Sequence, residues 1–225
     1  MRPFFYFYGA KYRLSGILPG PPRGCPVVEP FAGSACYSLR YNVQKATLVD
    51  VDPIIAGLWE YLIRVSETEI LALPDIPPGG SVDDFAIPQE AKWLIGFWLN
   101  QGSSMPKKTA GKFGAKSTWN LKGRQRVVSQ LPGIRQWKVI NADYQQAPVS
   151  REAVYFVDPP YLEKGTHYRF GRVDHPAVGQ WAETLPGRVI VCEQAGADWL
   201  PFKPVATVPA SYGWTAEVAW LRGWD

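Results

Sequence analysis

The feature that most constrains the fold is a short apolar run that ends abruptly in two prolines, at residues 153–161 (AVYFVDPPY). Its five apolar residues, mostly β-branched or aromatic, predict a buried strand. Proline offers no N–H to a neighbouring strand, so the strand ends before the pair and a stiff turn follows. Ligands of open α/β sheets bind at the carboxyl ends of the strands. We therefore expect Asp158, the carbonyl of Pro159 and the ring of Tyr161 to project into a crevice.

The residue types in this turn suit an amino group attached to a flat ring. Asp158 and the Pro159 carbonyl offer two hydrogen-bond acceptors, and Tyr161 offers a π-face. A plainer interpretation is a strand-ending turn in which Asp158 caps a helix. The segment on its own leaves both interpretations open.

A second predicted strand runs into a turn of small residues near the N-terminus. Residues 25–28 (CPVV) predict the strand, residues 29–35 (EPFAGSA) the turn and residues 36–39 (CYSL) the start of a helix. Gly33 and its small neighbours allow the backbone to lie against a cofactor. The pattern indicates the first strand–turn–helix of a nucleotide-binding half-fold.

Two further predicted strands, 46–50 and 137–141, also lead into acidic residues. Asp50 lies about 20 residues beyond the start of the glycine turn, where an acid commonly binds ribose hydroxyls. Asp143, next to Tyr144, suits either an acceptor for a cofactor amino group or an Asx turn, and both interpretations stay open. Asp52, by contrast, precedes Pro53 and predicts a helix cap.

The N-terminal residues 3–11 (PFFYFYGAK) place small residues directly after an aromatic run. Such residues let a ligand approach the backbone closely. The alternative is an N-terminal strand that fills the core. Toward the other end, residues 162–173 predict a surface loop able to close over a site, and His175 is expected to cap or pack. Residues 202–221 predict a β-hairpin.

Charge is distributed very unevenly along the chain. Residues 91–142 contain ten Lys and Arg and no acid, so this stretch carries +10; the whole chain carries +4, which leaves −6 for the remainder. Such an asymmetry, with aromatic residues among the bases, is typical of a polyanion partner. A solvated charged face would mix acids among the bases. The candidate contacts to nucleic acid are Lys107, Lys108, Lys112, Lys116, Lys122, Arg124 and Arg126.

Composition excludes several other classes. Three cysteines without paired spacing and two histidines argue against a disulfide framework, a zinc site or a histidine triad. We expect no metal. The 225 residues contain no apolar run of membrane-spanning length and no signal-peptide pattern, so we expect a cytoplasmic protein without a membrane partner.

Taken together and in this order, the YGAK, EPFAGSA, Asp50, Asp143-Tyr144 and DPPY motifs resemble those of Dam-like (D12 class) DNA adenine methyltransferases, of the alpha group of amino-methyltransferases. The resemblance covers nearly the whole chain. It implies a Rossmann-like α/β fold that binds S-adenosylmethionine (SAM), with a mostly parallel sheet closed by a C-terminal antiparallel hairpin. Residues 1–90 and 136–225 would form the catalytic domain, and residues 91–135 a small basic helical insert for target recognition. The implied activity is methylation of adenine N6 in double-stranded DNA by a monomer, with the adenine flipped out of the duplex.

The resemblance also implies roles for individual residues. Asp158 and the Pro159 carbonyl would hold the target amino group, Pro160 would stiffen the turn, and Tyr161 would stack on the flipped base. The residues that would bind SAM are Tyr8, Gly9, Ala10, Lys11, Glu29, Pro30, Phe31, Ala32, Gly33, Ser34, Asp50, Asp143, Tyr144 and Asp158.

Two residues depart from the family pattern, which often has Gly where this chain has Ala10 and Ala35. Each adds one methyl group, and the loop can still form if φ is negative at both, as alanine prefers. Three alternatives remain: a cytosine-N4 methyltransferase, an RNA amino-methyltransferase, and a catalytically idle nucleic-acid-binding module. Cytosine enzymes more often carry Ser at the first catalytic position, so Asp158 favours adenine.

Overall fold

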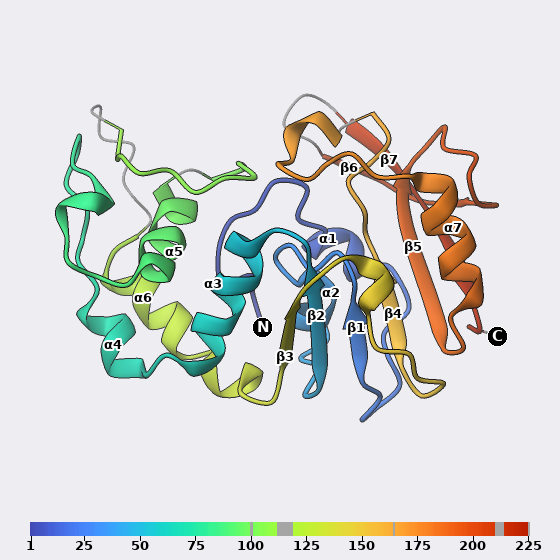
Figure 1. Ribbon diagram of the computed structural model, residues 1–225, viewed down its shortest axis with the longest axis horizontal. Coiled ribbons are helices and arrows are strands. Elements are labelled where there is room, and N and C mark those ends of the chain that lie inside the picture. Colours follow the sequence, from blue (N-terminus) through green and yellow to red (C-terminus); the bar gives the residue numbers. More distant parts are fainter. Residues whose placement is uncertain (100, 112–118, 164, 210–213, 225) are drawn as a thin grey trace.

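Seven strands form one mainly parallel sheet in the order β3-β2-β1-β4-β5-β7-β6 (Figure 1). The computed structural model describes residues 1–99, 101–111, 119–163, 165–209 and 214–224. The strands are β1 (Val27–Glu29), β2 (Ala46–Asp50), β3 (Lys138–Asn141), β4 (Val154–Val157), β5 (Arg188–Gln194), β6 (Lys203–Pro209) and β7 (Trp214–Arg222).

Within the described sheet only β7 runs against the other strands, pairing antiparallel with both β5 and β6. The remaining neighbours pair in parallel. The predicted Rossmann-like α/β sheet closed by a C-terminal hairpin is therefore confirmed. Residues 210–213, which the sequence places between the two strands of the hairpin, lie outside the described residues.

The strand order changes direction between β1 and β4, which are adjacent in the sheet although far apart in sequence. Such a switch point opens a crevice at the carboxyl ends of the two strands. Glu29 ends β1 and Asp158 directly follows β4, so the fold places both residues at this crevice.

Helices cover both faces of the sheet. Val154 and Phe156 point into the cluster that includes Trp59 of α3, while the alternate residues Tyr155 and Val157 pack with α7. The α-helices are α1 (Tyr12–Ser15), α2 (Cys36–Arg40), α3 (Pro53–Arg64), α4 (Glu67–Ala72), α5 (Gln89–Leu99), α6 (Leu121–Val128) and α7 (His175–Thr184).

Local start signals explain where α3 and α4 begin. Asp52 Oδ1 accepts a hydrogen bond from the Ile54 amide at 2.9 Å, and Pro53 occupies the first turn. Asp52 is thus a helix cap, as expected. Ser66 and Glu69 form a reciprocal capping box at the start of α4.

Helices α4, α5 and α6 form a lobe beyond the edge strand β3 (Figure 1). The N-terminal segment ties this lobe to the sheet without forming a strand. Phe4 and Phe5 are buried against Trp59, and the Phe4 carbonyl accepts a hydrogen bond from the Trp98 indole at 2.8 Å. Phe4 and Phe5 therefore fill the core, as the alternative interpretation of this segment expected. The strand that the same interpretation expected here does not form. The domain boundaries at 91 and 135 stay a prediction.

Candidate active site

A cleft of about 1390 Å³ opens where the parallel strands end, at the edge that lies uppermost in Figure 1. Its walls come from the N-terminal segment and from the loops that follow β1, β2, β3 and β4. All fourteen residues that the sequence assigns to a cofactor line this one cleft. Of the DPPY residues, Asp158 and Pro160 line it, whereas Pro159 and Tyr161 do not.

Asp50 holds the glycine turn to the end of β2. Its Oδ2 accepts a hydrogen bond from the Gly33 amide and its Oδ1 one from the Asp52 amide, both at 2.9 Å. Burial raises the pKa of Asp50 to about 6, and these two hydrogen bonds limit the rise. Gly33 has a φ of +44°, which favours glycine, and its carbonyl accepts from the Trp59 indole. Asp50 therefore shapes the turn in addition to facing the cleft.

Ala35 lies in the left-handed region with a φ of +48°, so the loop forms here although φ is positive. Its amide donates to the Ala32 carbonyl at 2.7 Å and its carbonyl accepts from Leu39, which holds the residue between the turn and α2. Ala10 is not among the described residues with positive φ, as alanine prefers.

Asp143 forms an Asx-type cap: its Oδ1 accepts from the Gln145 amide at 3.0 Å. The carboxylate also lines the cleft, so the turn and a contact to a ligand are compatible. The Tyr144 ring stacks on Phe31, with centroids 5.2 Å apart and an interplanar angle of 24°. Two motifs from separate strands, β1 and β3, thus build one wall.

Asp158 is a half-buried acid, one oxygen of which is buried without a hydrogen-bond partner. Its Oδ1 has no hydrogen-bond partner in the described structure, and the nearest cation is Lys11 Nζ at 3.9 Å. Burial raises the pKa of Asp158 to about 7, and the Lys11 ammonium limits the rise. A buried oxygen of this kind costs free energy unless a ligand supplies a hydrogen.

Lys11 occupies the space over Tyr161. Its ammonium lies 4.0 Å from the ring centroid and donates to the Gly9 carbonyl at 3.0 Å. Burial lowers the pKa of Lys11, but the carboxylates of Asp158 and Glu217 outweigh burial and raise it overall. The Tyr161 hydroxyl donates to Glu217 at 2.5 Å. Tyr161 is buried and engaged on both its face and its hydroxyl, so its ring is not open to a base in this structure, and the stacking role expected for it stays a prediction.

The loop that carries Pro160 is held by two buried residues: His175, which was expected to cap or pack, and Glu193, to which the sequence assigned no role. His175 Nε2 lies 2.9 Å from the Pro160 carbonyl and 3.8 Å from Glu193 Oε2. Glu193 also accepts from the Leu162 amide and the Trp199 indole, each at 3.3 Å. His175 is thus a packing residue that anchors the turn after β4, and the cap of α7 is Asp174.

Residues 165, 166 and 168–173 also line the cleft. Arg169 approaches Asp52 at 3.7 Å, and Tyr168 packs edge-on against Tyr8. The sequence predicted a surface loop able to close over a site here, with Tyr168, Arg169 and Phe170 in it, but it gave none of these side chains a role. The available signal was a cluster of aromatic and basic residues directly after the DPPY turn.

Two of the predicted nucleic-acid contacts are wrong because their side chains serve the fold. Arg124 is buried and forms an ion pair with Asp75 at 2.5 Å. Arg126 donates to the Pro3 carbonyl and stacks over Trp98, 4.3 Å from the ring centroid. Lys107, Lys108 and Lys122 are exposed, although Lys108 also pairs with Asp83 at 2.9 Å. Lys112 and Lys116 lie outside the described residues.

Within the described ranges, no group of three or more His, Cys, Asp or Glu side chains is arranged to hold a metal ion. In that same part of the chain, no helix has both the length and the apolar character needed to cross a membrane.

Comparison with known proteins gives fold-level likeness only. No family model and no curated protein matches the chain. Among solved structures it is similar to "Putative methyltransferase yhhF from Escherichia coli" (TM-score 0.41, 11% identity, 88% of this chain and 76% of that chain). For a conserved hypothetical protein of Streptococcus pyogenes the TM-score is 0.40 and the identity 11%, and the match covers 94% of this chain and 93% of that chain. For the "putative methylase HI0767 from Haemophilus influenzae" the TM-score is 0.37 and the identity 12%, and the match covers 88% of this chain and 78% of that chain. TM-scores this low do not assign a function.

Proposed function

We propose that this chain is a SAM-dependent methyltransferase that acts on the N6 amino group of adenine in DNA. The observation that supports the proposal most strongly is Asp158, whose partnerless buried oxygen lies in the cleft that Gly33 and Asp50 also line. A cofactor-type turn and an acceptor for an amino group thus share one cavity at the switch point of the sheet.

The cleft fits a cationic cofactor in charge and in size. Three basic side chains line it, Lys11, Arg169 and Arg172, against six carboxylates. The carboxylates are Glu29, Asp50, Asp52, Asp143, Asp158 and Asp174. SAM carries a positive sulfonium, which such a lining stabilises. The cleft also exceeds the roughly 300–1,000 Å³ of a typical small-molecule site, which leaves room for a base beside the cofactor.

The chain's own residues would orient the amine. The lone pair of an aromatic amine is delocalised into the ring, so the nitrogen is a weak nucleophile. Asp158 would accept one of its two hydrogens and direct the lone pair into the cleft. The Pro159 carbonyl, whose residue does not line the cleft in this structure, would have to turn toward the amine to accept the other. SAM, when bound, supplies the electrophilic methyl group. Asp158 would then stabilise the positive charge that develops on nitrogen, so orientation and electrostatics carry the catalysis.

The direct test is transfer of a labelled methyl group from SAM to DNA by the wild type and by Asp158→Ala. We expect Asp158→Ala to abolish transfer while calorimetry still shows SAM binding, because Asp158 contacts the amine. Asp198→Asn, an exposed acid outside the cleft, is the matched control and should keep full activity. An active Asp158→Ala enzyme would contradict the assigned role.

The same assay separates the alternatives. Competition among duplex DNA, single strands and RNA identifies the polymer, and analysis of the labelled nucleoside distinguishes adenine N6 from cytosine N4. A chain that binds nucleic acid but neither binds SAM nor transfers a methyl group would be the idle module.

A further inference from the structure

The cleft has one exposed aromatic side chain in the described part of the chain. Phe170 is 41% exposed, while every other described aromatic residue that lines the cleft is buried or half-buried. An aromatic ring kept in water at the mouth of a cleft is a stacking surface for a flat ligand.

Tyr161 does not offer such a surface. It is 5% exposed, Lys11 covers its face, and Glu217 engages its hydroxyl. A base stacked on Tyr161 would have to displace a buried ammonium that also pairs with Asp158. The acceptor for an amino group is therefore present in the cleft, but the ring expected to hold the base is not accessible.

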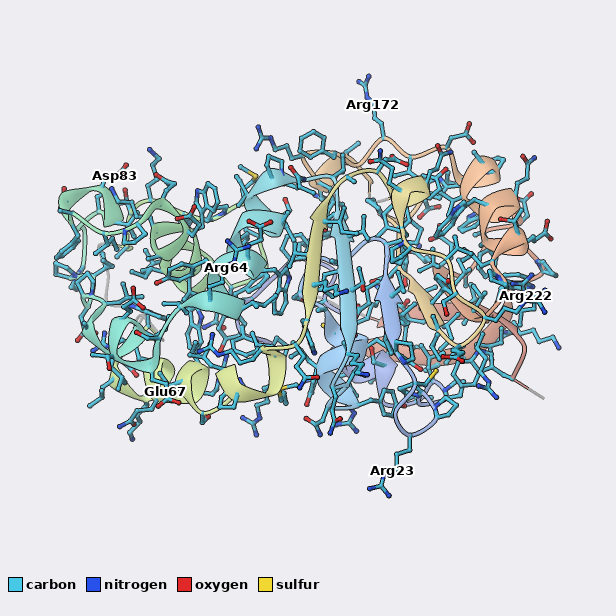
Figure 2. The ribbon with its side chains drawn as sticks, turned by 60° about the horizontal axis from the view of Figure 1, so that its bottom comes forward. Arg23, Arg64, Glu67, Asp83, Arg172 and Arg222 are labelled. Atoms are coloured by element: carbon cyan, nitrogen blue, oxygen red, sulfur yellow. The ribbon has the colours of Figure 1, made fainter. Side chains whose placement is uncertain are left out.

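The neighbours of Phe170 are cationic. The Arg169 guanidinium lies 5.2 Å from the Phe170 ring centroid. Arg172 is exposed, has no ion pair among the described side chains, and projects outward from the molecule (Figure 2). An exposed guanidinium two positions along the same loop from an exposed ring matches a base together with its phosphate.

We propose that residues 168–172 hold a base that has left its duplex, with Phe170 stacked on the base and Arg172 in contact with a neighbouring phosphate. This inference rests on the proposed function, because Asp158 makes an amino-bearing base the occupant of the cleft. It assigns the stacking to the loop between β4 and α7 instead of to Tyr161.

The experiment compares two duplexes of mixed sequence, each carrying 2-aminopurine, which is opposite an abasic site in one and paired with thymine in the other. Affinity is read from the anisotropy of a dye at the duplex end, and stacking from 2-aminopurine fluorescence. The abasic duplex offers a base that leaves the stack at low cost, so no recognition sequence is needed. The wild type should prefer this duplex and quench its 2-aminopurine.

Phe170→Ala should weaken binding of the abasic duplex about tenfold, within the range for loss of one stacked base, and leave the paired duplex unchanged. Phe170→Trp should restore both preference and quenching. Arg172→Gln should weaken binding of both duplexes and lower the slope of log affinity against log salt by about one. Leu221→Ala, an apolar residue of similar exposure outside the cleft, should behave as the wild type.

The inference is overturned if Phe170→Ala prefers the abasic duplex over the paired duplex as strongly as the wild type does, or if the wild type has no such preference. A Tyr161→Ala variant that alone loses quenching while it keeps its far-ultraviolet circular dichroism overturns it too. The methyl-transfer assay keeps the two proposals apart. Failed transfer with an intact Phe170 effect removes only the proposed function, and intact transfer with no Phe170 effect removes only this inference.

Discussion

At the scale of single residues, the site depends on the ionisation of Asp158. This side chain carries the negative charge that would stabilise a developing cationic amine only when it is deprotonated, and burial raises its pKa to about 7 with Lys11 limiting the rise. A base with a raised pKa titrates near neutral pH, so small changes around it alter the active fraction.

We predict that the rate of methyl transfer rises with pH through about 7 and then levels. In Lys11→Gln the rising limb should move to higher pH, because the cation that holds the pKa of Asp158 down is gone. Single-turnover rates from about pH 5 to pH 9 measure this. The control Asp198→Asn should have the same pH–rate profile as the wild type. If the rising limb of the profile lies at the same pH in Lys11→Gln as in the wild type, Lys11 does not act on the pKa of Asp158.

Ala35 stores backbone strain that glycine would relieve. Ala32, in the same turn, is also buried but lacks a positive φ, which makes it a matched comparison. Ala32→Gly should lower the free energy of unfolding by about 1–2 kcal/mol, through chain entropy and a lost methyl. In Ala35→Gly the same losses are offset because about 1–2 kcal/mol of backbone strain is relieved, so we predict a nearly unchanged free energy of unfolding. Equal losses in urea unfolding of both variants would contradict a strained Ala35.

At the scale of elements, the basic segment divides into residues that hold the helical lobe and residues that face solvent. Arg124 and Lys122 lie two positions apart on α6, one buried against Asp75 and the other exposed. The acid that neutralises Arg124 precedes it by 49 positions, so a count of charge along the chain does not reveal it.

We predict that Arg124→Gln lowers the free energy of unfolding by about 1–2 kcal/mol, since it removes a buried ion-pair partner whose acid is largely exposed. Lys122→Gln should change stability by less than about 0.5 kcal/mol. In DNA titrations only Lys122→Gln should lower the salt slope, by about one. If Arg124→Gln were as stable as the wild type and still lowered the salt slope of DNA binding, Arg124 would be a DNA contact after all.

The strands and their acidic ends were predictable because their signals are local. A run of β-branched residues, a Pro-Pro stop and an Asp-Pro helix start each act within a few residues, and β2, β4 and α3 follow them closely. The cover over Tyr161 was not predictable. It depends on Lys11 and Glu217, which reach that ring only through tertiary packing.

At the scale of the whole molecule, sheet topology joins motifs that lie up to 150 residues apart. The reversal between β1 and β4 brings the turn after β1 to the turn after β4, and the N-terminal segment closes the same cleft. That convergence followed from the motif order once a parallel sheet was assumed. A loop at residues 162–173 able to close over a site was also expected, but the side chains with which it lines the cleft were not, because loop paths depend on contacts with the N-terminal segment.

The central claim is that this cleft brings SAM and an adenine amino group together, and nucleoside analysis of cellular DNA tests it most directly. The chain and its Asp158→Ala variant would be expressed in a host that lacks adenine methylation, and the digested DNA analysed by mass spectrometry. We predict N6-methyldeoxyadenosine with the wild type and none with Asp158→Ala at equal protein level. Unmodified DNA from cells that contain folded wild-type protein would contradict the claim.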